Sequence, residues 1–442
     1  GILKTTGYES FNVRSKNTFN FFNDHLRVGN TFLIKSGDRQ YANLVITDIL
    51  RQNPLLPVYD ANVVGGYSTY APWMKNLDNP VGNLNLNTNH VYQTDIMLNG
   101  YAEADLFVKG LKYRLNVGIN RTTGRNYNKS DRRPDGTAVL QSSLNESAFF
   151  NNQWLIENTL HYDNTFDKHT ISLLAGYSSQ ENSNRGFGAK RLDIPAGTDA
   201  IDAASPAEQS TSGSLQEASM ISQFGRVMYT YDNRYLFTAT VRRDGSSRFD
   251  NGHRYGVFPS VALGWNIMNE SFFEKAKNSV NEFKIRATYG RLGNQEIANY
   301  TTQNVTRYGI NYIQGGAWWQ GAIPGTSWVS PSNLTWEETE TSNFGVDLAF
   351  LQSKLRISAD YYVRNTKDIL LSINQPPSAG KSGSPVMNAG TISNKGFEFL
   401  ASYRDAIGEV NYNIGVNASA VKNKMKAITV GNKQEFEGYN PQ

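Results

Sequence analysis

Apolar and polar residues alternate along many short runs of this chain, most clearly between Met220 and Arg291. In Tyr235–Asp244 every second residue is apolar as far as Val241, and most of the residues between them are Thr, Arg or Asp. The run Phe283–Gly290 has the same period. Successive side chains of a strand point to opposite faces, so this period of two predicts strands with one apolar and one polar face.

The alternating runs come in pairs, most of them joined by short turns, which is typical of antiparallel hairpins. The predicted pairs are Tyr8–Phe22 with Leu26–Lys35, Val91–Phe107 with Leu111–Asn120, Phe150–Tyr162 with His169–Tyr177, Met220–Tyr231 with Tyr235–Asp244, Val257–Ile267 with Phe283–Arg291, Thr341–Phe350 with Leu355–Arg364, and Gly396–Tyr403 with Asn411–Ala420. A short amphipathic piece, Asn269–Lys277, separates the two runs of the fifth pair. The sequence therefore predicts an all-β protein of about fourteen antiparallel strands.

The connections between successive pairs are much longer than the turns within them. They are rich in Gly, Pro, Asn and Ser, and Tyr41–Arg51 has a helical pattern. The long connections are Gly37–His90, Tyr127–Glu146, Asn182–Glu217 and Asn294–Pro331. Short turns at one end of the strands and long loops at the other are the rule in outer-membrane β-barrels, where the turns are periplasmic and the loops extracellular.

The distribution of Tyr and of charged residues favours such a barrel. Tyr stands near the ends of the apolar runs, as in the aromatic girdles at the two membrane interfaces. These residues are Tyr229, Tyr231, Tyr235, Tyr289 and Tyr361. Charged residues of both signs occupy the polar face, and we expect them to have structural roles along the lumen. They are Arg242, Asp244, Arg248, Lys284, Arg286, Arg356 and Asp360. The alternation alone leaves a soluble β protein open, with its apolar face packed on a second sheet.

Composition narrows the classes further. No run of roughly eighteen apolar residues predicts a membrane helix, but a barrel needs none, because only every second residue faces lipid. The chain has no cysteine, which excludes disulfides and thiolate metal sites. Its net charge of +4 is spread along the sequence, so we expect no nucleic-acid partner. It begins at Gly1 rather than Met, and we interpret it as a piece of a longer or a processed protein.

No pattern of residues predicts catalysis, a metal site or a cofactor. Of the five histidines only His161 and His169 share a hairpin, which is a weak metal signal. The end of a phosphate loop at Gly380–Ser382 lacks the earlier glycine that such a loop needs. Glu337, Glu338 and Glu340 resemble an acid pair for glycoside cleavage, but neighbouring strand residues point to opposite faces. We therefore expect a protein that is not an enzyme.

Aromatic residues in two of the long loops are the candidate contacts for a substrate or for a covering lid protein. They are Trp318, Trp319, Tyr308 and Tyr312 in one loop, and Tyr67, Tyr70 and Trp73 in the other. Aromatic faces at a barrel mouth could stack on sugar rings, pack on a peptide or bind a lid protein. Alternatively, they form the small cores that long loops need for their own packing.

Several segments resemble one family over essentially the whole chain. These are RDGSSRF (Arg243–Phe249), VFPSVALGWNI (Val257–Ile267), KIRATYGRLGNQ (Lys284–Gln295), NLTWEETETSNFGVDLAF (Asn333–Phe350), RNTKDILL (Arg364–Leu371) and NKGFEF (Asn394–Phe399), with GILKTTGY (Gly1–Tyr8) and NPLLPVYD (Asn53–Asp60). In this order they are similar to the barrel of SusC-like TonB-dependent transporters of Bacteroidota. The resemblance implies an antiparallel transmembrane β-barrel of about twenty-two strands in the cell outer membrane, of which this chain supplies about fourteen.

The resemblance also implies partners and a function. Residues 1–442 would all belong to the barrel, and the N-terminal plug, the TonB-contacting box and the remaining strands would lie outside this chain. The expected partners are TonB, a SusD-like surface lipoprotein acting as a lid, outer-membrane lipid and a glycan or peptide substrate. The function implied is TonB-dependent active import of oligosaccharides or oligopeptides. The alternatives are a passive or structural outer-membrane barrel and a soluble carbohydrate-binding β protein.

Overall fold

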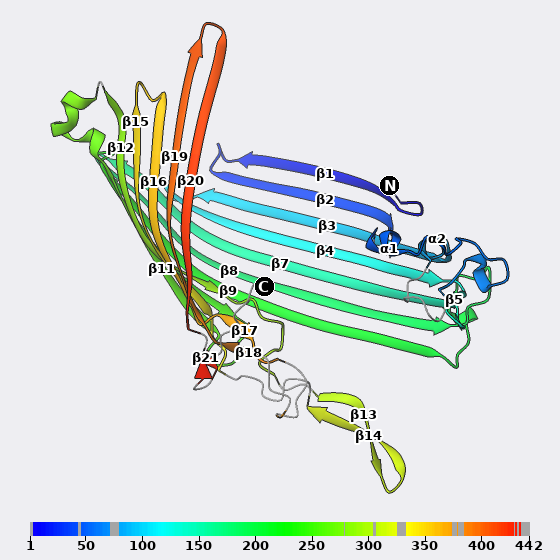
Figure 1. The fold of residues 1–442 in the computed structure, drawn as a ribbon. Coiled ribbons are helices and arrows are strands. Elements are labelled where there is room, and N and C mark those ends of the chain that lie inside the picture. Colours follow the sequence, from blue (N-terminus) through cyan, green and yellow to red (C-terminus); the bar gives the residue numbers. More distant parts are fainter. Residues whose placement is uncertain are drawn as a thin grey trace. The chain divides into compact units, whose positions relative to one another are not determined.

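All fourteen predicted strands are present in one antiparallel sheet and in chain order. The computed structural model describes residues 3–42, 46–70, 79–277, 279–303, 306–324, 333–373, 378, 384–427, 429–430 and 433–434. The sheet consists of β1 (Gly7–Phe21), β2 (Leu26–Gln40), β3 (Asn87–Asp105), β4 (Leu111–Ser130), β7 (Ser143–Phe166), β8 (His169–Leu192), β9 (Gln209–Tyr231), β10 (Tyr235–Ser246), β11 (Tyr255–Asn266), β12 (Val280–Asn294), β15 (Glu337–Phe350), β16 (Leu355–Lys367), β19 (Thr391–Ile407) and β20 (Val410–Ala427) (Figure 1). Each strand pairs with its neighbours in this order, and β1 and β20 are the two ends.

The remaining elements are short and lie in the connections. Four separate hairpins are β5 (Arg133–Asp135) with β6 (Ala138–Leu140), β13 (Thr306–Gln314) with β14 (Ala317–Pro324), β17 (Leu370–Ser372) with β18 (Val386–Asn388), and β21 (Thr429–Val430) with β22 (Lys433–Gln434). The helices are α1 (Ile46–Arg51) and α2 (Pro80–Leu86), with 3-10 turns η1 (Val64–Gly66), η2 (Ile201–Ala203), η3 (Ile267–Asn269) and η4 (Ser271–Ala276). None of the described helices is long and apolar enough to cross a bilayer.

The strands extend further toward the long connections than the alternation predicted. β8 continues to Leu192 instead of ending at Tyr177, and β9 begins at Gln209 instead of Met220. The predicted loop Asn182–Glu217 is therefore largely strand, and the loops starting at Gly37 and Tyr127 are also shorter than expected. In these extensions most residues on both faces are polar, with isolated exceptions such as Phe187 and Leu215, so the period of two disappears from the sequence while the backbone hydrogen bonds continue.

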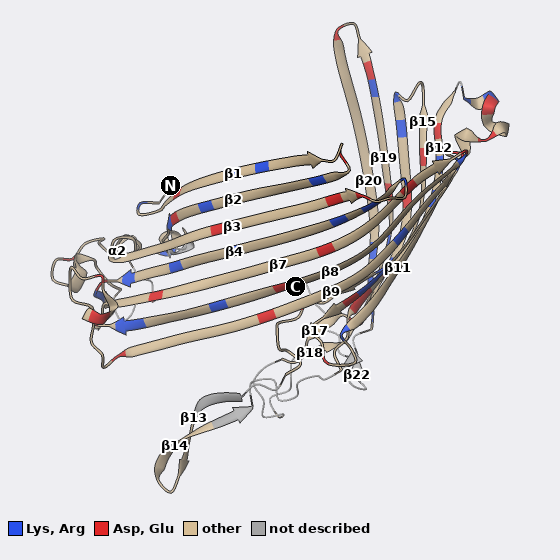
Figure 2. Ribbon diagram, turned by 180° about the vertical axis from the view of Figure 1, so that it is seen from behind, with Lys and Arg blue, Asp and Glu red and all other residues tan. Residues whose placement is uncertain are grey.

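Contacts divide the chain into two compact units, which we describe separately. The first comprises Gly1–Ala102, Asn116–Ile156 and Gln180–Glu217, and the second Glu103–Leu115, Glu157–Ser179 and Ala218–Gln442. Acidic and basic positions are interspersed along the strands of each unit (Figure 2).

In the second unit the register aligns the apolar side chains of successive strands in rows. Residues directly paired across antiparallel strands lie on the same face of the sheet. One such row consists of Tyr229, Phe237, Leu263, Ala287, Phe344, Tyr361, Phe397 and Ala420. Its large side chains are exposed, with Leu263 at 53%, Phe344 at 52% and Tyr361 at 50%. The apolar face of this unit is therefore an exposed surface and not one half of a buried core.

The first unit has the same two-faced strands. Val13 pairs with Ile34 and Phe19 with Val28 on one face, whereas Lys16 pairs with Thr31 and Asn12 with Lys35 on the other. Phe11 belongs to the apolar face and is 69% exposed.

Candidate functional site

The polar face of the second unit carries a charged cluster centred on Arg286. Its Nε donates to Asp347 Oδ2 at 2.7 Å and its Nη2 to Asp347 Oδ1 at 3.0 Å. Its Nη1 and Nη2 also donate to the two carboxylate oxygens of Asp360 at 3.2 and 3.1 Å. Ser358 completes the set by donating from Oγ to Asp347 Oδ1 at 2.8 Å. One planar guanidinium thus links strands β12, β15 and β16 through paired charge-assisted hydrogen bonds.

Gly345 makes this cluster possible. It lies on β15, where it is paired with Arg286 of β12 on one side and with Asp360 of β16 on the other. A Cβ at Gly345 would stand 2.8 Å from Arg286 Cζ and would also collide with the Asp360 carboxylate. The absence of a side chain on β15 lets the arginine reach across that strand.

Two more of the predicted charged residues lie on the same face. Lys284 is paired with Asp347 in the register, and Arg356 Nη1 lies 3.7 Å from Glu282 Oε2. The register thus places both on the face that carries Arg286 and opposite to Phe344.

The remaining predicted charged residues lie at or beyond the end of β10. Arg242 Nε donates to both carboxylate oxygens of Asp244 at 2.7 and 2.8 Å, and its Nη2 donates to Ser222 Oγ at 2.7 Å. Arg248 does not join this pair. It lies in the turn after β10, where its Nε donates to Asn299 Oδ1 at 3.1 Å and its Nη1 to the Gln295 carbonyl oxygen at 3.3 Å.

The motif RDGSSRF has mainly a structural role. Its last residue, Phe249, is 1% exposed and is packed in a small core at the long-loop end of the sheet. The other members of that core are Phe258, Ile297, Leu334 and Trp336. Trp336 Nε1 donates to the Arg254 carbonyl oxygen at 3.0 Å. The motif therefore fixes several connections to one another, and Gly245 within it accommodates the ring of Tyr255.

The aromatic candidates of the loop after β12 form an exposed hairpin. Strands β13 and β14 are joined by Gly315 and Gly316, whose positive φ values of 61° and 80° suit a two-residue turn. Trp318 is 73%, Trp319 54% and Tyr312 49% exposed. The hairpin therefore presents several aromatic side chains to solvent. Tyr308 belongs to β13, but its side chain lies outside the described residues.

The candidates of the first long loop pack within that loop. Tyr70 donates from its hydroxyl to Asp135 Oδ1 at 2.6 Å, and Tyr67 lies with its ring centroid 5.5 Å from that of Tyr59. Trp73 lies outside the described residues, as does the segment Gly380–Ser382 in the connection between β17 and β18. For Tyr67 and Tyr70 the geometry agrees with the alternative in which loop aromatics form cores of their own.

The glutamates at the start of β15 are divided between the two faces. Glu338 and Glu340 lie 3.2 and 3.1 Å from the guanidinium of Arg291, and Lys367 Nζ donates to Glu340 at 2.8 Å. Glu337 points to the other face and accepts from the backbone N–H of Leu370 at 3.1 Å. These contacts are structural ion pairs and hydrogen bonds and do not form an isolated pair of carboxylates.

The two hairpin histidines have separate partners. His161 contacts Thr159 Oγ1 at 3.2 Å, while His169 Nδ1 lies 2.7 Å from the Tyr229 hydroxyl oxygen. Within the described residues, no group of His, Asp and Glu side chains could hold a metal ion.

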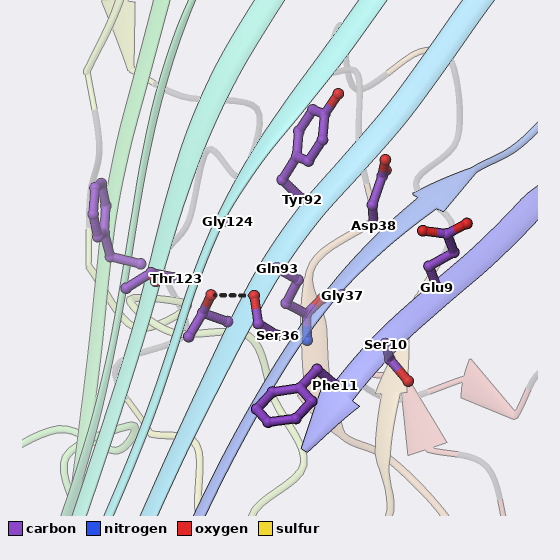
Figure 3. Close-up of a pocket in the computed structure, with 12 residues that line it drawn as sticks. Glu9, Ser10, Phe11, Ser36, Gly37, Asp38, Tyr92, Gln93, Thr123 and Gly124 are labelled. Atoms are coloured by element: carbon purple, nitrogen blue, oxygen red, sulfur yellow. Dashed lines mark hydrogen bonds between the residues drawn. The ribbon is translucent and has the colours of Figure 1, made fainter. Parts of the chain in front are cut away.

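A hollow of about 690 Å³ on the first unit was not predicted from the sequence. Phe11, Tyr92 and Phe150 line it together with small residues such as Ser36 and Thr123, and Ser36 is hydrogen-bonded to Thr94 at 3.2 Å (Figure 3). Phe11 and Ser36 are paired in the register and belong to the apolar face, so the hollow opens on that face. Acidic Glu9 and Asp38 lie at its rim.

A long antiparallel sheet with one exposed apolar face, one face of paired charges, short turns and long loops defines the class of membrane β-barrels. Residues 7–439 match the family described as TonB dependent receptor-like, beta-barrel, and the chain belongs to this family. Its members are outer-membrane proteins, so the exposed apolar face meets lipid. The soluble alternative is therefore wrong.

Relatives and solved structures agree with this family. The chain is 31% identical to TonB-dependent receptor P3 of Formosa agariphila over 88% of this chain and 38% of that protein. It is 26% identical to TonB-dependent receptor SusC of Bacteroides thetaiotaomicron over 99% of this chain and 45% of that protein. It thus spans less than half the length of either relative. The RagAB peptide importer in its closed-closed state shares the fold with a TM-score of 0.83 at 21% identity, over 98% of this chain and 48% of that one.

Proposed function

We propose that this chain is the barrel part of a TonB-dependent active importer of oligosaccharides or oligopeptides. The observation that carries the proposal is the single antiparallel sheet, which has one exposed apolar face and one polar face with ion pairs. The chain that forms this sheet belongs to a family of TonB-dependent receptors. The plug, the TonB-contacting segment and the remaining strands would belong to the rest of a longer protein. A SusD-like surface lipoprotein would cover the barrel mouth.

In this proposal the polar face lines an aqueous lumen. Arg286, Asp347 and Asp360 satisfy one another's charges, so the strands carry ionised groups without leaving any of these three unpaired in the wall. Such a wall would be rigid and would leave movement to the plug. No bond of the substrate is made or broken by any residue in this account.

Two observations of different kinds support the proposed substrate classes. The structural neighbour described above is named a peptide importer, and one relative is named SusC. The exposed aromatic rings of Trp318 and Trp319 could stack on a sugar ring or pack on a peptide equally well. We therefore propose both substrate classes, with the β13–β14 hairpin as a contact for the substrate or for the lid protein.

Energy dependence separates an active importer from a passive barrel. Cells that express the full-length protein would be given fluorescent oligosaccharide or oligopeptide mixtures, with and without a protonophore. Active import predicts that periplasmic accumulation is lost when the proton gradient collapses, while the amount of protein in the outer membrane stays constant. Uptake that continues unchanged with the protonophore would instead establish the passive barrel.

The role of the hairpin can be tested in the same cells. Replacing both Trp318 and Trp319 by Ala should reduce uptake by about tenfold, because stacked aromatic contacts are typically worth roughly 0.5–1.5 kcal/mol each. Phe107 is the control, since it is also an exposed aromatic residue, at 97%, but lies in the short turn between β3 and β4 and not in a long connection. Phe107→Ala should leave uptake unchanged. Equal effects of the two changes would remove the hairpin from the substrate path.

A further inference from the structure

We propose that an apolar groove on the lipid-facing side of the second unit binds an acyl chain of outer-leaflet lipid A, and that Arg243 binds the phosphate of that lipid. The groove has a volume of about 670 Å³ and crosses strands β4 to β11. Leu160, Leu173, Gly225, Val241, Pro259 and Val261 line it. Its size lies within the roughly 300–1,000 Å³ typical of ligand pockets.

The register shows which face the groove occupies. Gly225 pairs with Val241, and Val241 pairs with Pro259. These residues lie four positions along their strands from the row that contains Phe237 and Leu263, an even number, and therefore on the same, lipid-facing side. The groove is continuous with a surface that already meets acyl chains.

Gly225 leaves the groove open where it crosses β9. Its φ is not positive, and among the described residues a Cβ built on it would meet only the Leu174 carbonyl oxygen at an ordinary 3.7 Å. Neither the backbone nor the neighbouring side chains therefore require glycine here. Glycine weakens the interior of a strand and often marks a place where a ligand approaches closely. An acyl chain lying over the strand would account for the missing side chain.

Arg243 supplies a cation at the edge of the groove. It lies two residues beyond Val241 on the same face and is paired with Gln223 and Val257. Its Nη1 donates to Gln223 Oε1 at 3.3 Å, and its guanidinium carbon lies 3.9 Å from the centroid of the Tyr255 ring. Neither of these partners, which are its contacts within the described chain, is acidic. The ring holds the guanidinium plane and leaves donors for the oxygens of a phosphate.

The level of Arg243 in the membrane identifies the leaflet. The segment Tyr235–Arg243 starts at a short turn and is about as long as the roughly 9–11 residues with which a tilted strand crosses the bilayer. Arg243 consequently lies among the headgroups on the long-loop side, which is the extracellular leaflet. That leaflet carries lipid A, which combines phosphate with saturated acyl chains. The hollow at Phe11 has acidic Glu9 and Asp38 at its rim, which disfavour a phosphate there.

The test is native mass spectrometry of the full-length protein, purified in detergent and titrated with lipid A, dephosphorylated lipid A or phosphatidylglycerol. We expect one molecule of lipid A to bind. Arg243→Gln should weaken its binding about tenfold or more, since hydrogen bonds to charged groups are each worth that much. Gly225→Leu should abolish binding by filling the groove. Dephosphorylated lipid A should bind wild type as weakly as lipid A binds the Arg243→Gln variant.

Two control variants separate the groove from general effects. Arg404→Gln makes the same change of charge on the opposite face of the sheet. Gly415→Leu makes the same change of size on that opposite face, at a position where a Cβ meets nothing within 4 Å among the described residues. Both should bind lipid A like wild type, and heat-modifiable mobility on gels confirms folding of every variant. Unchanged binding by folded Gly225→Leu and Arg243→Gln would overturn the proposal. Equal binding of phosphatidylglycerol would overturn the assignment to lipid A.

Discussion

At the scale of single residues, small side chains decide where charges can meet. Arg286 reaches Asp347 on the neighbouring strand and Asp360 on the strand beyond because Gly345 leaves room above β15. The two carboxylates are 61 and 74 residues away from the arginine in sequence. The alternation identified Arg286 and Asp360 as members of one polar face, but it could not identify their contact, because strand register is fixed only when the sheet forms.

Replacing Gly345 by Ala should destabilise the protein by about 1 kcal/mol, because the charge network that it disturbs is only partly buried. The new Cβ would stand 2.8 Å from Arg286 Cζ and would displace the guanidinium from both carboxylates. The measurement is the urea midpoint of unfolding of the full-length protein in detergent. Gly415→Ala is the control, since a Cβ there meets nothing within 4 Å in the described part of the chain and alanine is less flexible than glycine when unfolded. A common midpoint for both variants would show that the cluster contributes no stability.

At the scale of elements, the sequence identified the strands by their membrane-crossing parts and underestimated their length. β4 was predicted to end at Asn120 but continues to Ser130, where Lys129 holds the connection between β8 and β9. Lys129 Nζ donates to Asp199 Oδ1 and to the Thr198 carbonyl oxygen, both at 2.9 Å. The sequence around Lys129 and Asp199 shows no alternation of apolar and polar residues. The structure of the long loops is set by such individual contacts. The sequence therefore predicted where these loops lie along the chain, but not how they fold.

The contact between Lys129 and Asp199 should make this connection sensitive to acid. Hydrogen bonds from Lys129 and Tyr127 hold the pKa of the Asp199 carboxyl below its usual range. A lowered pKa in the folded protein means that the contact stabilises the loop above the unfolded value of about 3.9 and is lost as the pH falls through the lowered value. We expect a spin label at Ala200→Cys to be restrained at neutral pH and to become mobile only below about pH 4.

The matched variant for this pH experiment is Asp199→Asn in the same labelled protein. The amide cannot ionise, so the label should be more mobile at neutral pH and should show no transition on acidification. This stretch of chain has no cysteine of its own that would take up the label. A transition of the same size in the Asn variant would assign the acid sensitivity to another group.

At the scale of the whole sheet, the alternation predicted which side chains share a face, and the register confirms it from β9 to β20. Phe237, Phe344, Tyr361 and Phe397 form one exposed row although they are distant in sequence. The class of fold was predictable because a lipid-facing surface imposes the period of two on every strand. The groove and the hollow were not, because they depend on which small residues become neighbours across strands.

The apolar band itself can be mapped with spin labels placed singly from Ile357 to Lys367 along β16 in the full-length protein reconstituted in bilayers. The register places Ile357, Ala359, Tyr361 and Val363 on the lipid-facing side, so their labels should collide preferentially with oxygen, which concentrates in the acyl region. The labels at the intervening positions should collide preferentially with a water-soluble nickel complex.

The same strand also marks the edge of the band. Beyond Val363 the lipid-facing side continues with Asn365 and Lys367, and Lys367 is bonded to Glu340 at 2.8 Å. Ion-paired groups of this kind belong above the acyl chains, where water solvates them. Labels at these two positions should therefore be reached by the nickel complex, although they share a face with Tyr361. If oxygen instead reached the label at Lys367 as readily as the label at Tyr361, the band would extend further than the residue pattern allows, and Arg243 would lie too deep to meet a headgroup.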